Sequence, residues 1–102
     1  MIKIIEMLKA VINPFIMAEN IGQYYILIAD TKDEIYKHMT TSPSAQNTLL
    51  NVIINELDMC ITCTDDKSAA IVFYWHSLTD YIRILTYIAE DAERAAERSA
   101  RQ

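Results

Sequence analysis

Glycine and proline are almost missing from this chain of 102 residues, which contains one glycine and two prolines. Folds built from many short strands need tight turns, and these two residues supply most of them, so a many-stranded sandwich is disfavoured. Hydrophobic residues make up 52% of the chain and charged residues 23%, a composition that also disfavours disorder. We therefore expect one domain, residues 1–102, whose core is large enough to fold without metal or disulfide bonds.

Positive charge is also scarce. The net charge is −5, and residues 38–64 contain no lysine or arginine, although Glu56 and Asp58 lie among them. Proteins that bind nucleic acid carry basic surfaces, so no nucleic-acid partner is expected. A basic segment of another protein is a more natural partner for such an acidic chain.

Long hydrophobic runs are missing too. No stretch of about 18 uninterrupted apolar residues occurs, so we expect no transmembrane helix and no membrane partner. The N-terminal apolar run contains Lys3, Glu6 and Lys9 and has no small-residue cleavage site, which disfavours a signal peptide. Two cysteines without an export signal predict a protein of the reducing cytoplasm.

Two stretches in the first two thirds of the chain have apolar residues at helical spacing. Residues 2–12 place Ile5, Leu8 and Ile12 on one face and end at Asn13-Pro14, because a residue before proline avoids helical geometry. A second helix is predicted after Ser42 and Pro43, which suit the N-cap and the first helical position. Its apolar stripe consists of Leu50, Ile53, Leu57 and Cys60, flanked by Leu49 and Ile54.

A third and longer helix is predicted from Ser77 to Gln102. Ser77 and Asp80 match a capping box, in which a hydroxyl and a carboxylate satisfy the amides of the first turn. The core-facing stripe becomes small toward the C-terminus, so the last part of this helix is expected to protrude or to pack closely at a small interface. The stripe consists of Leu78, Ile82, Leu85, Ala89, Ala92, Ala96 and Ser99.

Two short runs indicate buried strands. Residues 24–29 (YYILIA) and 69–75 (AAIVFYW) are apolar on both faces and rich in β-branched or aromatic side chains. Residues 59–64 alternate with period two and lead through a loop at 65–68 into the second run, which predicts a hairpin. Residues 15–18 are a further candidate strand.

The predicted fold is therefore α+β, with a small antiparallel sheet flanked by the three helices. Residues 31–39 leave both a helix and an edge strand open. Thr31 and Glu34 match a capping box that would start a helix, but Thr31-Lys32-Asp33 could equally be a turn, with residues 34–40 returning as an edge strand. Ile71 and Trp75 also continue the stripe of the C-terminal helix. One long helix over 69–101, and with it an all-α helical bundle, is the alternative.

Catalytic and metal-binding patterns are weak. Cys60 and Cys63 invite a redox or zinc interpretation, but on a strand they would lie roughly 10 Å apart and face opposite ways. Further zinc ligands would have to come from His38 and His76, so structural cysteines are favoured over a metal site or a redox pair. There is no glycine-rich phosphate loop, nucleophile elbow or metal-binding helix motif. We expect no enzyme activity and no cofactor.

Apolar residues on two sides of the C-terminal segment point instead to binding. Phe73, Ile84 and Tyr87 lie on the side opposite the main stripe. A single small domain does not easily cover a helix on opposite sides, so part of this surface is expected to meet another chain. A dimer contact, a bound partner, or both would cover this surface.

The layout resembles the class I type III secretion chaperones, small acidic bacterial proteins that bind secreted effectors. The resemblance rests on an amphipathic helix (IIEMLKAVI), a turn and strand ending in aspartate (GQYYILIAD), a mid-chain helix (NTLLNVIINEL) leading into a hairpin (CITCTDDKSAAIVFYW), and a closing helix (LTDYIRIL). The chain departs from the family in length, with little room between Asp30 and Ser42 for the extra strands that members carry.

The resemblance implies a cytoplasmic bacterial α+β homodimer, without ATPase activity, that holds the N-terminal segment of an effector in an extended form. Two rival predictions do not depend on the resemblance: an acidic immunity-type or phage-type inhibitor of a folded protein, and a thiol enzyme using Cys60 and Cys63. The remaining implications concern the chaperone. The client would bind at a sheet edge and apolar grooves formed by Ile5, Leu8, Ile12, Tyr25, Leu27, Ile71 and Phe73. The dimer contacts would come from Leu49, Leu50, Ile53, Ile54 and Leu57.

Overall fold

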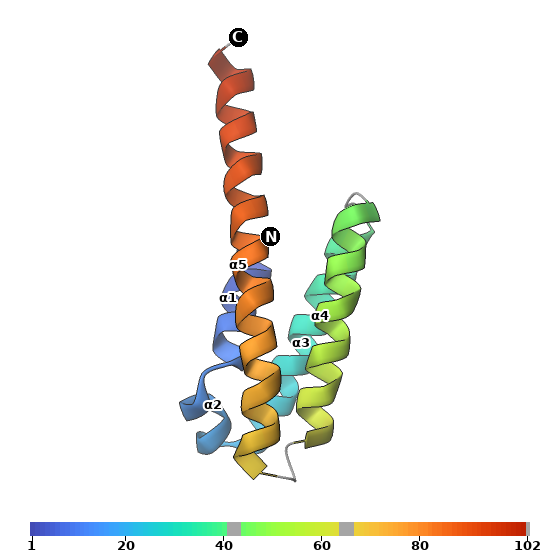
Figure 1. The fold of residues 1–102 in the computed structure, drawn as a ribbon, viewed down its shortest axis with the longest axis vertical. Coiled ribbons are helices and arrows are strands. Elements are labelled where there is room, and N and C mark those ends of the chain that lie inside the picture. Colours follow the sequence, from blue (N-terminus) through green and yellow to red (C-terminus); the bar gives the residue numbers. More distant parts are fainter. Residues whose placement is uncertain (41–43, 64–66, 102) are drawn as a thin grey trace.

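Five helices make up the described part of this chain. The computed structural model describes the backbone of residues 1–40, 44–63 and 67–101, and the side chains of 1–40, 44–62 and 71–100. No strand occurs in these ranges, so the predicted α+β fold is wrong and its all-α alternative is correct. The helices are α1 (Ile2–Val11), α2 (Pro14–Glu19), α3 (Ile21–Met39), α4 (Ser44–Cys63) and α5 (Lys67–Arg101) (Figure 1).

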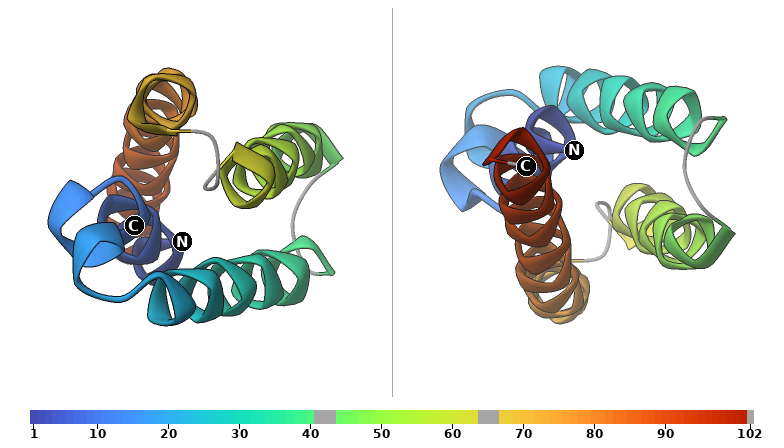
Figure 2. Two further views of the ribbon diagram at one scale, coloured as in Figure 1. Left: turned by 90° about the horizontal axis from the view of Figure 1, so that it is seen from below. Right: turned by 90° about the horizontal axis from the view of Figure 1, so that it is seen from above.

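The four longer helices lie side by side and alternate in direction along the chain (Figure 1). Seen along the long axis, α1 lies between α3 and α5, and α4 packs against α3 and α5 on the other side (Figure 2). The short helix α2 packs against α1 and α3 at the lower end of the bundle. α5 has 35 residues and runs along the longest dimension of the molecule, whose extents are 54 × 23 × 21 Å.

The core is built from one stripe of each longer helix. In α3 the buried residues are Tyr24, Ile28, Thr31 and Ile35, and their spacing of four and three is that of one helical face. In α5 the stripe is Ile71, Trp75, Leu78, Ile82 and Leu85. α1 and α4 contribute Ile4, Ile5, Leu8, Val11, Leu50, Ile53, Ile54, Leu57 and Cys60.

The two segments predicted as strands are helical, and each carries an apolar side chain on its solvent-exposed face. Residues 24–29 lie in α3, where Ile26 is 61% exposed, and residues 69–75 lie in α5, where Phe73 is 66% exposed. These exposed apolar side chains hide the polar face by which an amphipathic helix is normally recognised. The ambiguous residues 31–39 also belong to α3, and residues 15–18 belong to α2.

The predicted hairpin and two predicted helix starts are also wrong. Residues 59–63 continue α4, and Ser77 lies within α5, where its hydroxyl donates to the carbonyl of Phe73 at 3.5 Å instead of capping a helix. Thr31 is likewise inside α3, with its Oγ1 donating to the carbonyl of Leu27 at 2.7 Å. The predicted turn residues 65 and 66 and the predicted cap at 42 and 43 lie outside the described residues.

Two asparagines cap the N-termini of α2 and α3. The Oδ1 of Asn13 accepts a hydrogen bond from the amide of Phe15 at 3.0 Å, with Pro14 at the first helical position. The Oδ1 of Asn20 accepts from the amides of Gly22 at 2.9 Å and Gln23 at 3.2 Å. A Cβ at residue 22 would lie 3.2 Å from that oxygen, so glycine gives the cap its room. The turn expected just before residues 24–29 is thus a helix junction.

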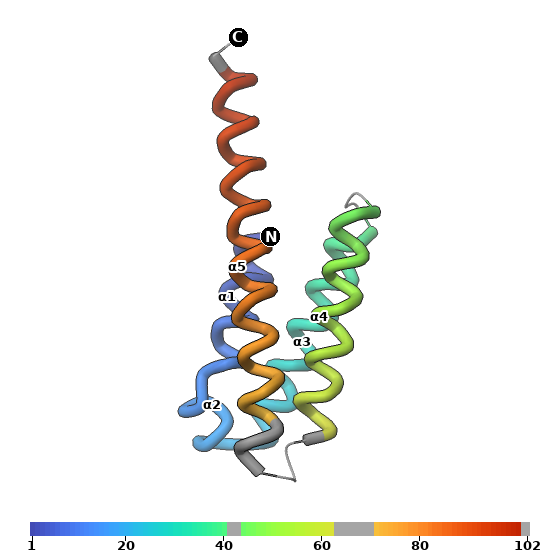
Figure 3. The backbone as a smooth tube through the Cα atoms, in the orientation of Figure 1, coloured from blue at the N-terminus to red at the C-terminus, as the bar shows by residue number. Residues whose placement is uncertain are grey.

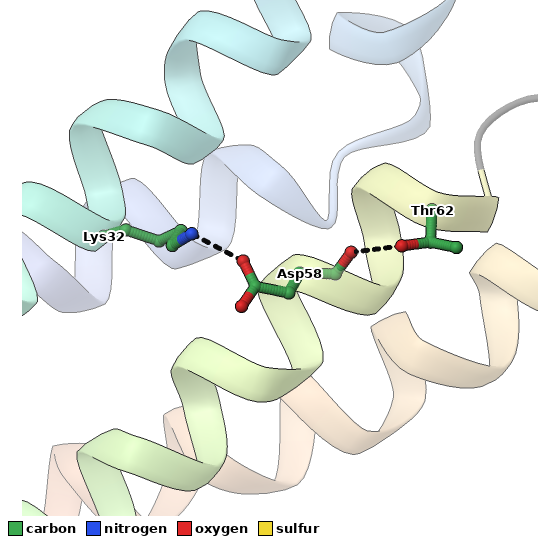
Figure 4. Close-up of polar contacts among 3 residues, drawn as sticks. All are labelled: Lys32, Asp58 and Thr62. Carbon is green, nitrogen blue, oxygen red and sulfur yellow. Dashed lines mark hydrogen bonds and ion pairs between the residues drawn. The ribbon is translucent and has the colours of Figure 1, made fainter.

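Two polar contacts link α3 to α4 and α5. Lys32 on α3 forms an ion pair with Asp58 on α4, with 2.5 Å between Nζ and Oδ1, while the carbonyl of Asp58 accepts from the Thr62 hydroxyl (Figure 4). In the core, Trp75 Nε1 on α5 donates to the Tyr24 hydroxyl on α3 at 3.2 Å. Together with the apolar stripes, these contacts fix α3, α4 and α5 relative to one another.

Candidate functional site

The two cysteines lie on α4, so the prediction that a strand holds them apart is wrong. Residues three apart on a helix lie on the same side of it. Cys60 is buried in the core, where it lies close to the Tyr24 hydroxyl and is out of reach of a substrate. The side chain of Cys63 is outside the described side chains. Among the side chains that are described, no group of three or more His, Cys, Asp or Glu could hold a metal ion.

An open groove runs between α1 and α5. Its larger part has a volume of about 410 Å³, and a second depression of about 350 Å³ continues it along α5. We call the two together the α1–α5 groove, since they share Lys9, Thr86 and Glu90. Its lining residues are Ile2, Ile5, Glu6 and Lys9 from α1, and Ile82, Arg83, Thr86, Tyr87, Ala89, Glu90 and Glu93 from α5.

The floor of this groove is apolar and its edges hold exposed apolar side chains. Ile5 and Ile82 are buried beneath it and belong to the core. Ile2 on α1 is 70% exposed, and Tyr87 on α5 is 67% exposed. An apolar floor with apolar edges is the kind of surface that takes the side chains of an amphipathic helix.

The charges of the groove leave an excess of carboxylate. Both cations already have partners, because Lys9 pairs with Glu6 at 3.6 Å and Arg83 pairs with Asp80 at 3.3 Å. Glu90 and Glu93 form no ion pair with the described side chains. The groove is therefore acidic on its α5 side.

The upper part of α5 extends the acidic flank beyond the bundle. Residues 91–100 are all exposed, and α5 continues past the ends of α1 and α4 (Figure 3). The sequence predicts Glu90–Arg94 and Glu97–Arg101 pairs on this segment. Arg94 instead binds Asp91, and this hydrogen bond raises the pKa of Arg94. The side chain of Arg101 is outside the described ones.

A third depression, on the other flank of α1, is mainly polar. It has a volume of about 340 Å³ and is lined by residues of α1 and α3. Lys3 and Glu34 form an ion pair across it at 3.4 Å. Its charges alternate in sign and it offers little apolar surface, so it is a weaker candidate for binding a protein segment. The lining residues are Lys3, Met7, Asp30, Asp33, Glu34 and Lys37.

The structure does not gather the predicted client-binding residues. Ile5 lines the α1–α5 groove, but Leu8 and Ile71 are buried in the core. Ile12, Tyr25 and Leu27 are half-buried, whereas Phe73 is exposed on the outside of α5. The prediction placed residues 25–27 and 71–73 on strands of one small sheet. In the described part of the chain that sheet edge does not exist.

The stripe of α4 that was predicted to form the dimer contacts is buried within a single chain. Leu50, Ile53, Ile54 and Leu57 are buried, and Leu49 is half-buried against the same core. Packing against α3 and α5 accounts for this stripe without a second copy. A homodimer stays a prediction.

Several groove residues were missed by the sequence reasoning, chiefly Ile2, Thr86, Glu90 and Glu93. The signal available for them was small: an alanine stripe from Ala89 onward and glutamates beside it.

Comparisons with protein-family models, with curated proteins and with solved structures give no match for this chain. None of the described helices is both long enough and apolar enough to cross a membrane.

Proposed function

We propose that this chain is a non-enzymatic binding protein that holds a helical segment of a partner protein in the α1–α5 groove. The observation that carries the proposal is the groove itself, with its buried apolar floor of Ile5 and Ile82 and its exposed edges at Ile2 and Tyr87. An amphipathic helix would place its apolar stripe on this floor and replace the water there, which is the driving force for such capture.

The mode of capture follows from the all-helical fold. An extended segment gains affinity by adding a strand to a sheet edge, and the described part of this chain has none. A helical segment satisfies its own backbone hydrogen bonds and needs only side-chain contacts. The partner segment is therefore held as a helix.

A secretion chaperone is one role that fits this proposal. In that role the captured helix belongs to a client that is not yet folded, and the client is released before export. The rival role is inhibition of a folded protein, for which the acidic surface and net charge of −5 favour a basic target. Proteolysis of the isolated complex distinguishes them, because a chaperone protects a stretch of client that is otherwise digested, whereas an inhibitor leaves a folded target as resistant as before.

The groove is tested directly with a peptide and a blocking substitution. The probe is an 18-residue helical peptide with a leucine stripe and glutamine at its other positions, titrated by fluorescence anisotropy. Ala89→Trp fills the groove, and Ala29→Trp adds the same side chain to the exposed face of α3 as a control. We expect Ala89→Trp to weaken binding at least about tenfold, the effect of blocking a well-packed contact, and Ala29→Trp to leave it unchanged. Equal binding by both variants, or no binding by the native chain, would contradict the proposal.

A further inference from the structure

α5 lacks a neighbour on one side of its upper part. α1 begins at Ile2 and covers the flank of α5 only as far as the residues that line the groove, Thr86, Ala89, Glu90 and Glu93. Above this point α5 continues without a neighbouring helix (Figure 3). The same flank thus changes from a packed helix–helix contact to open surface within one helix.

The uncovered flank has two kinds of side chain. Ala89 and Ala96 continue the core stripe of α5 and let another helix approach closely. Glu90, Glu93 and Glu97 follow at spacings of three and four, so they form one edge beside the alanines. Arg94 lies next to this edge, four residues after Glu90, but it forms its ion pair with Asp91 on its other side. The three glutamates are exposed and form no ion pair with the described side chains.

We infer that the partner segment is a basic amphipathic helix that begins in the α1–α5 groove and continues along α5 beyond the N-terminus of α1. Its apolar stripe contacts the groove floor and Ala89 and Ala96, and its lysines or arginines face Glu90, Glu93 and Glu97. This inference rests on the proposed function and adds to it the charge of the partner and its place along α5. The stretch from Thr86 to Ala100 is about 20 Å long, so the partner helix contributes about four turns.

Charge also decides against a second copy of the chain in this position. Two copies packed antiparallel through this flank would bring Glu90 near Glu97 and Glu93 near its own counterpart. Like charges facing each other at a helix contact are destabilising. A basic partner removes that repulsion and leaves each glutamate with an opposite charge.

The test compares charged versions of the neutral peptide. One version has lysines beside the leucine stripe and the other has glutamates, and both are titrated against the native chain at low and at physiological salt. We expect the lysine peptide to bind roughly tenfold more tightly than the glutamine peptide at low salt, the range expected for three exposed ion pairs. We expect this advantage to shrink as salt is added. Equal binding of the lysine and glutamate peptides would overturn the inference.

Matched variants locate the effect. Glu90→Gln, Glu93→Gln and Glu97→Gln together remove three charges from the proposed edge. Glu19→Gln, Asp30→Asn and Asp33→Asn together remove three charges from the exposed surfaces of α2 and α3. We expect the first triple variant to lose the preference for the lysine peptide and the second to keep it. An equal loss in both would mean that net charge alone attracts the peptide, and would overturn the inference.

Controls keep this test separate from that of the proposed function. Circular dichroism of both triple variants checks that α5 stays helical, as expected because glutamine and glutamate have similar helix propensities. If the glutamine peptide binds in the groove but the lysine peptide gains nothing, the inference fails and the proposed function stands. If light scattering shows a dimer that the first triple variant strengthens, a second copy occupies the flank and the inference is wrong.

Discussion

The lower and upper parts of α5 have one helical register but different surroundings. From Ile71 to Leu85 the stripe is made of large side chains that are buried against the neighbouring helices. From Ala92 onward the same stripe continues as alanine and serine, and residues 91–100 are exposed. The lower part is therefore stabilised by tertiary packing, and the upper part by helix propensity and local ion pairs alone.

This difference separates what holds the bundle together from what is free to bind. Buried leucine and isoleucine side chains contribute strongly to the free energy of folding, because each removes its apolar surface from water. Exposed alanines contribute little to folding, yet they give a partner helix a smooth surface at close range. Leaving the upper part of α5 exposed therefore has almost no effect on the free energy of folding, so this surface is free to bind another helix.

Truncating the lower stripe tests the first half of the comparison. Leu78→Ala removes a fully buried side chain, and we expect it to lower the free energy of unfolding by about 2–5 kcal/mol, as for other leucine truncations in a core. Urea unfolding followed by circular dichroism measures this. A loss below about 0.5 kcal/mol, the usual limit for a surface position, would show that the lower part of α5 is not the core of the fold.

The buried hydroxyl that binds Trp75 gives a smaller effect with a distinctive pH dependence. Tyr24→Phe leaves the indole donor of Trp75 without its acceptor, so we expect a loss of about 1–3 kcal/mol at pH 7. Burial raises the pKa of the Tyr24 phenol above its usual range. The native chain should therefore be most stable below pH 10 and lose stability as the pH rises, because unfolding then releases a proton.

Tyr24→Phe isolates the contribution of the Tyr24 hydroxyl to this pH dependence. The stability of this variant should fall less steeply above pH 10 than that of the native chain, in the same series of urea titrations. The hydrogen bond to Asp58 raises the pKa of Lys32 and adds an alkaline loss of its own, but Lys32 is present in both proteins. Parallel pH profiles for the two proteins would mean that Tyr24 ionises in the folded state.

A partly buried carboxylate on α4 has a still smaller effect. Glu56 Oε2 is shielded from solvent and accepts no hydrogen bond from the described residues, and burial raises the pKa of this carboxyl. The charged form is thus unfavourable in the folded chain at neutral pH, and this cost disappears as the pH falls through the raised pKa. We expect Glu56→Gln to stabilise the chain at pH 7 by roughly 0.5 kcal/mol, with no gain near pH 4.

The control for Glu56 comes from the upper part of α5. Glu93→Gln makes the same chemical change at an exposed position. Its midpoint of thermal unfolding should match that of the native chain at both pH values. A gain at pH 7 from Glu93→Gln as large as that from Glu56→Gln would assign the effect to net charge.

Glycine in the upper part should have the smallest effect on global stability. Ala96→Gly weakens a helix locally by about 1 kcal/mol, but residue 96 makes no buried contact in the described structure. We expect the urea midpoint to stay unchanged, while amide hydrogen exchange near residue 96 becomes faster. A clear shift of the midpoint would mean that the upper part is coupled to the core, and would erase the distinction between the two parts.

The sequence predicts the helices whose outer faces are polar. The helix at 2–12 and the mid-chain helix are confirmed, although α4 runs to Cys63 rather than ending before a strand. The protruding end of α5 is also confirmed, since its alanines have too little apolar surface to bury. Helical periodicity is a reliable signal when one face is polar.

The errors come from apolar residues that face solvent. Ile26 and Phe73 made 24–29 and 69–75 look apolar on both faces, although Ile71 and Trp75 already fitted the register of α5. The α1–α5 groove could not be predicted, because it depends on which helices become neighbours. The pairing of Arg94 with Asp91 rather than Glu90 was equally open, since helices place residues three and four apart at similar distances.

Hydrogen exchange measured by mass spectrometry, with and without the lysine peptide, distinguishes the packed part of α5 from the part that binds the partner helix. In the free chain we expect residues 90–100 to exchange much faster than residues 71–85, because only the latter lie in the packed bundle. With the peptide bound, protection should increase in residues 86–100 and in α1, and nowhere else. Protection that appears instead around Phe73 and Ile84, or no change in residues 86–100, would contradict the account.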